Sequence, residues 1–318
     1  MRQILYTVLL FSGVSIAQNS FGEARTLFAD QDYQGAERLF KEHLSSNPKN
    51  LQTIEYLGDV AGHKKDWDKA TEYYKKLVEV QGNNAEYQYK YGGALGMKAL
   101  ESNKFKALGL IGDIKKAFKK AAELDPKHIN VRWALVEFYI QLPGIIGGSE
   151  RKAIKYANEL ENLSTVDGYL AKGYIAEYSN RPKDAEKYYK KAVNIGGSIT
   201  CYEKLSGLYE KTTEEPQKAI AVIEEAQSKH QRNALHYQLG KVSAQYNIQL
   251  DKGIVCLEKY IENHSEKDGV PKSWAYYRLA QIHKHKGNKD RAMMYIDMAL
   301  SEKQLKPFKT EKKAILNL

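Results

Sequence analysis

The sequence predicts an all-α solenoid, a superhelical stack of about eight helical hairpins closed by a short C-terminal helix. Residues 166–199 form two short amphipathic segments, and the pattern of the first recurs along the chain, with four of the seven steps being 33 or 34 residues. The small and apolar positions of this segment are Tyr169, Gly173 and Ala176, followed by Ala185, Tyr189 and Ala192. A lone hairpin of this size cannot bury both of its apolar faces, so it must stack against copies of itself.

Eight units fit this spacing, and they begin near residues 17, 51, 85, 129, 166, 199, 233 and 273. The small position of each first helix is held by Ala24, Gly58, Gly92, Val136, Gly173, Ser206, Gly240 and Ala280. Prolines and glycines that end helices fall where several units should close, as at Pro48 and Gly197. We expect the solenoid to cover residues 18–307 and the apolar run at 308–318 to cap its last unit.

Composition limits the kinds of partner. Charged residues make up 28% of the 318 residues, hydrophobic residues 42%, and the formal net charge is +10. The lysines come as scattered pairs such as Lys75–Lys76 and Lys190–Lys191 on the predicted outer helices. This scatter favours a solvated face over a nucleic-acid-binding stripe, which would gather basic residues on one surface. We therefore expect no nucleic-acid partner.

The N-terminus predicts the compartment. A short basic start with Arg2 precedes the apolar run from Ile4 to Val14, and Ser15-Ile16-Ala17 forms a small-x-small cleavage signal. This is the three-part form of a secretory signal peptide over residues 1–17. We expect cleavage after Ala17, export to the periplasm or the exterior, and no membrane span in the remaining chain. An uncleaved N-terminal anchor is the alternative.

No pattern of catalytic residues is found. There is no Gly-x-Ser-x-Gly elbow and no His-Glu-x-x-His helix, and the glycines at 92–96 lack a phosphate-loop ending. His283 and His285 stand two residues apart on a helix and would point to different faces, so they are not expected to chelate a metal. Cys201 and Cys256 should be buried free thiols. The sequence predicts no enzyme, no cofactor and no metal.

The repeat resembles that of the tetratricopeptide repeat family. In the second unit the matching residues are Leu57, Gly58, Trp67, Ala70 and Tyr74. In the fifth they are Gly173, Ala185, Tyr189 and Ala192, and in the eighth Tyr276, Leu279, Ala280, Gly287, Ala292 and Ala299. The resemblance covers essentially residues 18–305 and implies a binding or scaffolding protein. The lysine and asparagine set with which one branch of the family clamps a C-terminal carboxylate is incomplete, because the asparagine is absent from every unit.

The resemblance also implies that the first helices line a concave groove, with the residue three before the small position pointing into it. That position is aromatic in five units, at Phe21, Tyr89, Trp133, Tyr237 and Tyr277. Nearby inner-wall candidates are Glu137, Tyr174, Lys241 and Gln281. We expect these residues to hold an extended segment of a protein or peptide partner by aromatic contacts and hydrogen bonds. Two alternatives remain: some of the aromatics tilt into the core, or the groove binds a glycan or envelope polymer.

Two neighbouring units depart from the period. The third carries extra residues within 100–113 and the fourth within 142–149, both between the two helices of their unit. Because both insertions emerge on the same edge of the stack, their apolar residues could form a recognition lobe beside the groove. Those residues are Leu108, Leu110, Ile111, Ile145 and Ile146. The alternative is that they pack on each other and only cover the edge.

Overall fold

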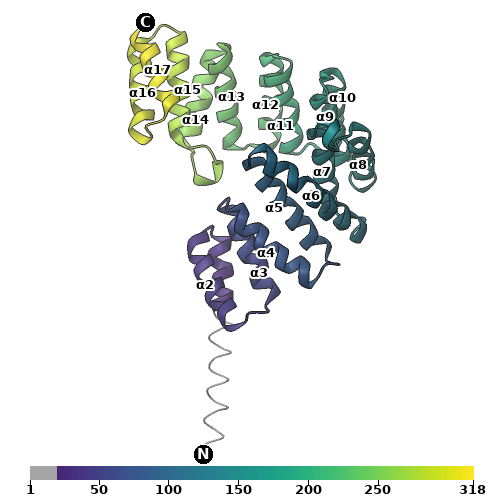
Figure 1. Ribbon diagram of the computed structural model, residues 1–318. Coiled ribbons are helices and arrows are strands. Elements are labelled where there is room, and N and C mark those ends of the chain that lie inside the picture. Colours follow the sequence, from purple (N-terminus) through teal and green to yellow (C-terminus); the bar gives the residue numbers. More distant parts are fainter. Residues whose placement is uncertain (1–19) are drawn as a thin grey trace, which may run out of the picture. The chain divides into compact units, whose positions relative to one another are not determined.

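The computed structural model describes residues 20–318, and every regular element in this range is a helix. The predicted signal segment at 1–17 lies outside the described residues. The chain separates into two compact units, one ending at Leu163 and the other spanning Ser164–Leu318. In each unit consecutive helices run up and down as hairpins, and hairpins stack on their neighbours (Figure 1). The predicted all-α helical-repeat fold is confirmed.

The first unit holds four hairpins. A helix over residues 20–29 precedes α2, and the later pairs are α3 with α4, α5 with α6, and α7 with α8. Their bounds are α2 (Tyr33–Ser46), α3 (Leu51–His63), α4 (Trp67–Val80), α5 (Ala85–Glu101), α6 (Lys104–Leu124), α7 (Ile129–Gln141), the 3₁₀ turn η1 (Gly144–Ile146) and α8 (Glu150–Leu163).

The second unit holds four hairpins and a terminal helix. The bounds are α9 (Thr165–Tyr178), α10 (Pro182–Gly196), α11 (Ile199–Gly207), the π-helical turn η2 (Leu208–Thr212), α12 (Pro216–His230), α13 (Asn233–Tyr246), α14 (Leu250–Glu262), the 3₁₀ turn η3 (Glu266–Asp268), α15 (Lys272–His285), α16 (Lys289–Glu302) and α17 (Lys306–Leu316). The last helix caps the unit as predicted, because Phe308 and Ile315 are fully buried against Ala292 and Ile296 of α16.

The turn inside several hairpins has one geometry. One residue adopts a left-handed conformation after the first helix, at Gln31, Lys65, Asn180 and Gly287. The next N–H then donates to the carbonyl five residues earlier, as from Asp66 to Ala61 (2.8 Å) and from Arg181 to Ala176 (2.8 Å). This pattern satisfies the last carbonyls of the first helix and reverses the chain direction.

Small residues set the distance between the two helices of a hairpin. The ring of Tyr74 lies over Gly58, and the ring of Tyr189 lies over Gly173, so a Cβ on either glycine would come within 2.5 Å of ring carbon. The predicted small positions are therefore places of close helix approach. Cys201 and Cys256 are buried free thiols, as expected.

The extra residues of the third unit do not form a separate loop. They lengthen α5 to 17 residues and α6 to 21, and only Ser102 and Asn103 connect the two helices. The extra residues of the fourth unit form the short turn η1 before α8. Both departures thus keep the hairpin order, the first by lengthening two helices and the second by adding a turn. None of the helices between residues 20 and 318 combines the length and the apolar composition that a bilayer crossing needs.

Candidate partner-binding site

The predicted inner-wall residues of the first unit lie in different environments. Phe21 is partly buried against the core, with its ring centroid 5.7 Å from that of Phe40 and 5.0 Å from that of His43. Tyr89 and Glu137 instead border an open apolar groove. Trp133 is half-buried on α7. Phe21 therefore packs on the core, as the alternative expected, whereas Tyr89 and Glu137 line the groove.

In the second unit the predicted residues are largely engaged with their own chain. Tyr237 is only 8% exposed, and its ring lies 5.3 Å from that of Tyr260. Lys241 pairs with Glu210 at 2.8 Å. Tyr237 is part of the core, so the prediction that it contacts a partner is wrong. The cause is the packing of α13 against both α14 and α15, which closes over this position.

Tyr174, Tyr277 and Gln281 are also held by local contacts. Tyr174 is half-buried, and the Lys204 ammonium lies 5.7 Å from its ring centroid. The ring of Tyr277 stacks on Phe308 of the capping helix at 5.1 Å, and the Gln281 amide donates to the Tyr277 hydroxyl at 3.0 Å. Tyr277 and Gln281 thus help to attach α17, which closes the end of the solenoid.

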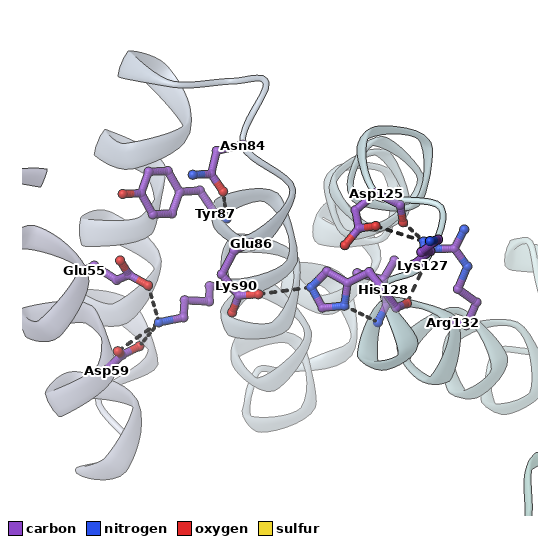
Figure 2. A network of polar contacts seen from close by, with 11 residues as sticks. Glu55, Asp59, Asn84, Glu86, Tyr87, Lys90, Asp125, Lys127, His128 and Arg132 are labelled. Carbon is purple, nitrogen blue, oxygen red and sulfur yellow. Dashed lines mark hydrogen bonds and ion pairs between the residues drawn. The ribbon is translucent and has the colours of Figure 1, made fainter. Parts of the chain in front are cut away.

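A polar network joins α3, α4 and α5 in the first unit, and Figure 2 shows its contacts between Lys90 and the carboxylates of Glu55 and Asp59. The Lys90 ammonium donates to Glu55 at 2.7 Å and to Asp59 at 2.8 and 2.9 Å, and the Tyr74 hydroxyl donates to Asp59 at 2.6 Å. Burial alone would lower the pKa of Lys90, but the attraction and hydrogen bonds of Asp59 and Glu55 outweigh it and raise the pKa. The polar groups of this stretch therefore satisfy one another within the chain.

A second part of this network fixes α7 against α6. The buried Arg132 guanidinium donates to the carbonyls of Asp125 (2.7 Å) and Ala122 (3.2 Å) at the C-terminal end of α6. His128, the N-cap of α7, contacts Glu86 of α5 through its Nε2 at 3.0 Å (Figure 2). A cation at a helix C-terminus satisfies orphan carbonyls and complements the helix dipole. These contacts position the three helices that surround the groove.

The groove lies among α5, α6 and α7 and the turn η1, and its volume is about 630 Å³. Its walls are mostly aliphatic and aromatic, and the only charged lining residues are Lys104 and Glu137. Both departures from the repeat contribute to it. The lining side chains from these departures and from α7 include Leu100, Leu108, Ile111, Phe138, Leu142 and Ile146.

The predicted recognition lobe is thus partly assembled. Leu108, Ile111 and Ile146 line the groove together. Leu110 faces a separate, more polar cleft beside Trp67, and Ile145 is 97% exposed outside the groove. Sequence reasoning missed Met97, Leu100 and Phe138. The sequence does contain a signal for Met97 and Leu100. Gly93, Met97 and Leu100 are spaced by four and three residues, which places them on one face of a helix.

Large apolar side chains at this edge are unusually exposed. Leu100 is 72% exposed, Phe105 88% and Ile145 97%, more than any other large hydrophobic residue of the described chain. All three stand within the two insertions or directly beside the α5–α6 turn. Clustered apolar exposure of this kind marks an interaction surface rather than ordinary surface scatter.

The groove lining is mostly apolar and carries few groups that could bind a metal. Between residues 20 and 318 no group of three His, Cys, Asp or Glu side chains lies close enough to hold a metal ion. The groove itself contains one amine and one carboxylate among apolar walls. Such a surface can exclude water from the apolar face of a ligand, and its charged groups can orient that ligand. These are properties of a binding site.

Comparison with known proteins agrees with this architecture. A family model described as tetratricopeptide repeat matches residues 21–95, and another with the same description matches 166–195 and 275–304. A tetratricopeptide repeat protein from Parabacteroides merdae has the same fold, with 14% identity, a TM-score of 0.53, and coverage of 94% of this chain and 98% of that one. This chain is a helical-repeat protein, and residues 21–95, 166–195 and 275–304 match tetratricopeptide repeats.

Two curated relatives are much longer proteins. The chain is 24% identical to the mouse Protein O-mannosyl-transferase TMTC3 over 181 residues, which cover 54% of this chain and 19% of the relative. It is 28% identical to the human protein of that name over 196 residues, which cover 60% of this chain and 20% of the relative. The chain thus spans about a fifth of the length of these relatives. Groove residues such as Leu100, Leu108 and Ile146 lie between the ranges that the family models match.

Proposed function

We propose that this protein is a non-enzymatic interaction scaffold of the cell envelope that binds a protein partner in the apolar groove of its first unit. The observation that carries the proposal is the convergence of both insertions on one groove, where Leu100 and Leu108 remain exposed. Keeping these side chains in water is unfavourable, by about 25 cal/mol per Å² of apolar surface that a partner could cover. A partner that covers them recovers this free energy.

The fold supports a scaffold more than a catalyst. Helical repeats present an extended surface, and members of the family are generally non-catalytic binding proteins. The relatives named as mannosyl-transferases share only a fifth of their length with this chain, so their activity is not assigned to it. The envelope location rests on the signal-like segment at residues 1–17.

The test is site-specific photo-crosslinking in cells of the native organism. A photoreactive phenylalanine analogue is placed at Leu100, which lines the groove, or at Val80, which is 67% exposed but outside it. We expect a discrete crosslinked protein in the envelope fraction from the Leu100 position and none from the Val80 position. Equal crosslinking from both positions, or none from either, would contradict a partner in this groove, and capture of a glycan instead of a protein would favour the alternative function.

A further inference from the structure

We infer that the groove of the first unit receives an amphipathic α-helix of the partner, with an aliphatic face in the groove and a carboxylate near Lys104. This inference rests on the proposed function and specifies the chemistry of the partner. It follows from the periodicity of the groove walls, from their exposure, and from the charge of Lys104.

The walls of the groove are three helical stripes. On α5 the lining positions are Tyr89, Gly93, Gly96, Met97 and Leu100, and on α6 they are Lys104, Ala107, Leu108, Ile111, Ile114 and Phe118. At 1.5 Å per residue these stripes are about 16 and 21 Å long, which matches a helix of about 11 to 14 residues. The α7 stripe of Ala134, Glu137, Phe138 and Gln141 completes the third side. The apolar faces of these three helices surround a space that a fourth helix could fill. This is the helix-in-groove mode of recognition.

Exposed apolar side chains at the end of the groove distinguish a helix from a small amphiphile. Leu100 and Phe105 flank the α5–α6 turn and are 72% and 88% exposed, and Phe105 lies outside the groove lining, so a ligand confined to the groove would leave Phe105 in water. A helix about 10 Å wide that extends past this end could cover both side chains. The apolar area that remains exposed is therefore better matched to a protein segment than to a single acyl chain.

Two glycines keep the floor open. Cβ atoms built on Gly93 and Gly96 of α5 would meet nothing within 4 Å, whereas one on Gly92 would lie 2.8 Å from the Phe118 ring. Gly92 thus has a packing role, but Gly93 and Gly96 have none within the described chain. Each glycine in a helix costs about 1 kcal/mol relative to alanine. Their place in the groove permits the close approach of a second helix.

Lys104 gives the sign of the charge that a partner would carry at this end of the groove. Six lysines lie on α6, but the others line separate clefts and only Lys104 lines the groove. Lys104 stands exposed at the end of the groove, where α5 turns into α6. An acidic residue at the matching end of the bound helix would neutralise part of this charge and orient the helix. The lysines of α6 are Lys104, Lys106, Lys115, Lys116, Lys119 and Lys120.

The experiment measures binding of model peptides to the full chain by fluorescence anisotropy. The probe is a fluorescein-labelled helix of about 14 residues with leucine on one face and two glutamates at one end. The controls are a scrambled peptide of the same composition, the same helix with lysine in place of glutamate, and dodecanoate as a competing small amphiphile. We expect the acidic amphipathic helix to bind most tightly, and dodecanoate to compete weakly.

Matched variants locate the bound peptide. Gly96→Leu fills the groove and should weaken binding about tenfold or more. Gly112→Leu makes the same change on α6 in open space outside the groove, and its affinity should stay within about twofold. Lys104→Glu should weaken the acidic peptide about threefold and strengthen the lysine peptide. Circular dichroism checks that all three variants keep their helix content.

Several results would overturn the inference. These are equal binding of the scrambled peptide, tighter binding of dodecanoate than of the helix, or equal losses in Gly96→Leu and Gly112→Leu. A dimer that Gly96→Leu dissociates would assign the groove to a second copy of this chain instead. A chain that crosslinks a protein through Leu100 but fails to bind the helix would refute only the helical chemistry and leave the proposed function standing.

Discussion

Gly173 and Tyr189 touch so closely that a Cβ on the glycine would lie 2.4 Å from Cε1 of the ring. The ring cannot move aside easily, because Tyr189 is fully buried and its hydroxyl donates to Glu177 at 2.9 Å. This contact fixes the distance between α9 and α10. It represents the packing rule of the whole chain, in which a small residue on one helix receives a large one from the next.

Gly173→Ala should therefore destabilise the protein even though alanine favours helix formation. We expect a loss of about 1–3 kcal/mol in unfolding free energy from overpacking, measured by urea denaturation. Gly207→Ala is the matched control, because Gly207 is also helical but its Cβ would meet nothing within 4 Å. That variant should be neutral or gain up to about 1 kcal/mol. Equal effects of the two substitutions would show that the α9–α10 distance is not set by this contact.

The ion pairs of Lys90 should matter more than a surface pair. Lys90→Met leaves Glu55 and Asp59 facing each other on the inner wall without their shared cation, and we expect a loss of about 1–2 kcal/mol. Lys41→Met removes an exposed pair with Glu37 on α2, and its effect should stay below about 0.5 kcal/mol. Thermal denaturation of both variants provides the comparison, and a larger loss in Lys41→Met would argue against the inter-repeat role of Lys90.

Tyr237 should behave as a core residue and not as a partner contact. Tyr237→Ala removes a ring packed against Tyr260, so unfolding free energy should drop by about 3 kcal/mol. Tyr178→Ala removes a ring that is 53% exposed on α9 and should cost within about 1 kcal/mol. Guanidinium denaturation measures both. If Tyr237→Ala kept full stability, the burial of this ring would not reflect a structural role.

Acidification should destabilise the second unit through His283. This residue is buried on α15 against the Tyr295 ring, and neither ring nitrogen has a hydrogen-bond partner within the described chain. Burial, with smaller contributions from Arg291 and Lys286, lowers the pKa of His283 below its ordinary value. The unfolded chain therefore takes up a proton at higher pH than the folded chain does. Stability is complete above the unfolded pKa and falls as the pH drops from about 7 to 5.

His283→Phe should reduce this pH dependence, because phenylalanine keeps the stacking on Tyr295 and cannot be protonated. Each unit by which the folded pKa is lowered corresponds to about 1.4 kcal/mol of lost stability once both states are protonated. The measurement is unfolding free energy as a function of pH for the wild type and the variant. Some slope should remain, since burial also lowers the pKa of His43 and His236. An unchanged slope would mean that His283 is not the responsible group.

The sequence predicted the fold well because its rules are local and repeat. A small residue such as Gly58 or Gly173 at a fixed spacing implies a close helix contact wherever it recurs, and the structure places Tyr74 and Tyr189 there. Capping of the last unit was equally predictable, because an open helical repeat with the apolar Phe308 and Ile315 downstream needs to cover its end.

The site was predicted only in part, since side-chain direction depends on tertiary packing. Tyr89 and Tyr237 occupy the same position of the repeat, yet one borders a groove and the other is buried between helices. The repeat spacing shows how many residues are inserted but not which structure they adopt. The sequence therefore could not show whether the extra residues extend α5 and α6 or form a loop. Lys90 and Asp59 form an ion pair although they are 31 residues apart in the sequence. This contact becomes apparent only when neighbouring repeats are packed together.

The central claim is that a partner binds the groove of the first unit, and hydrogen–deuterium exchange with the crosslinked or co-purified partner tests it most directly. Binding should slow exchange in residues 93–108 and 138–146, which line the groove, and leave residues 164–318 unchanged. Protection confined to residues 164–318, with unchanged exchange along α5 and α6, would contradict the account.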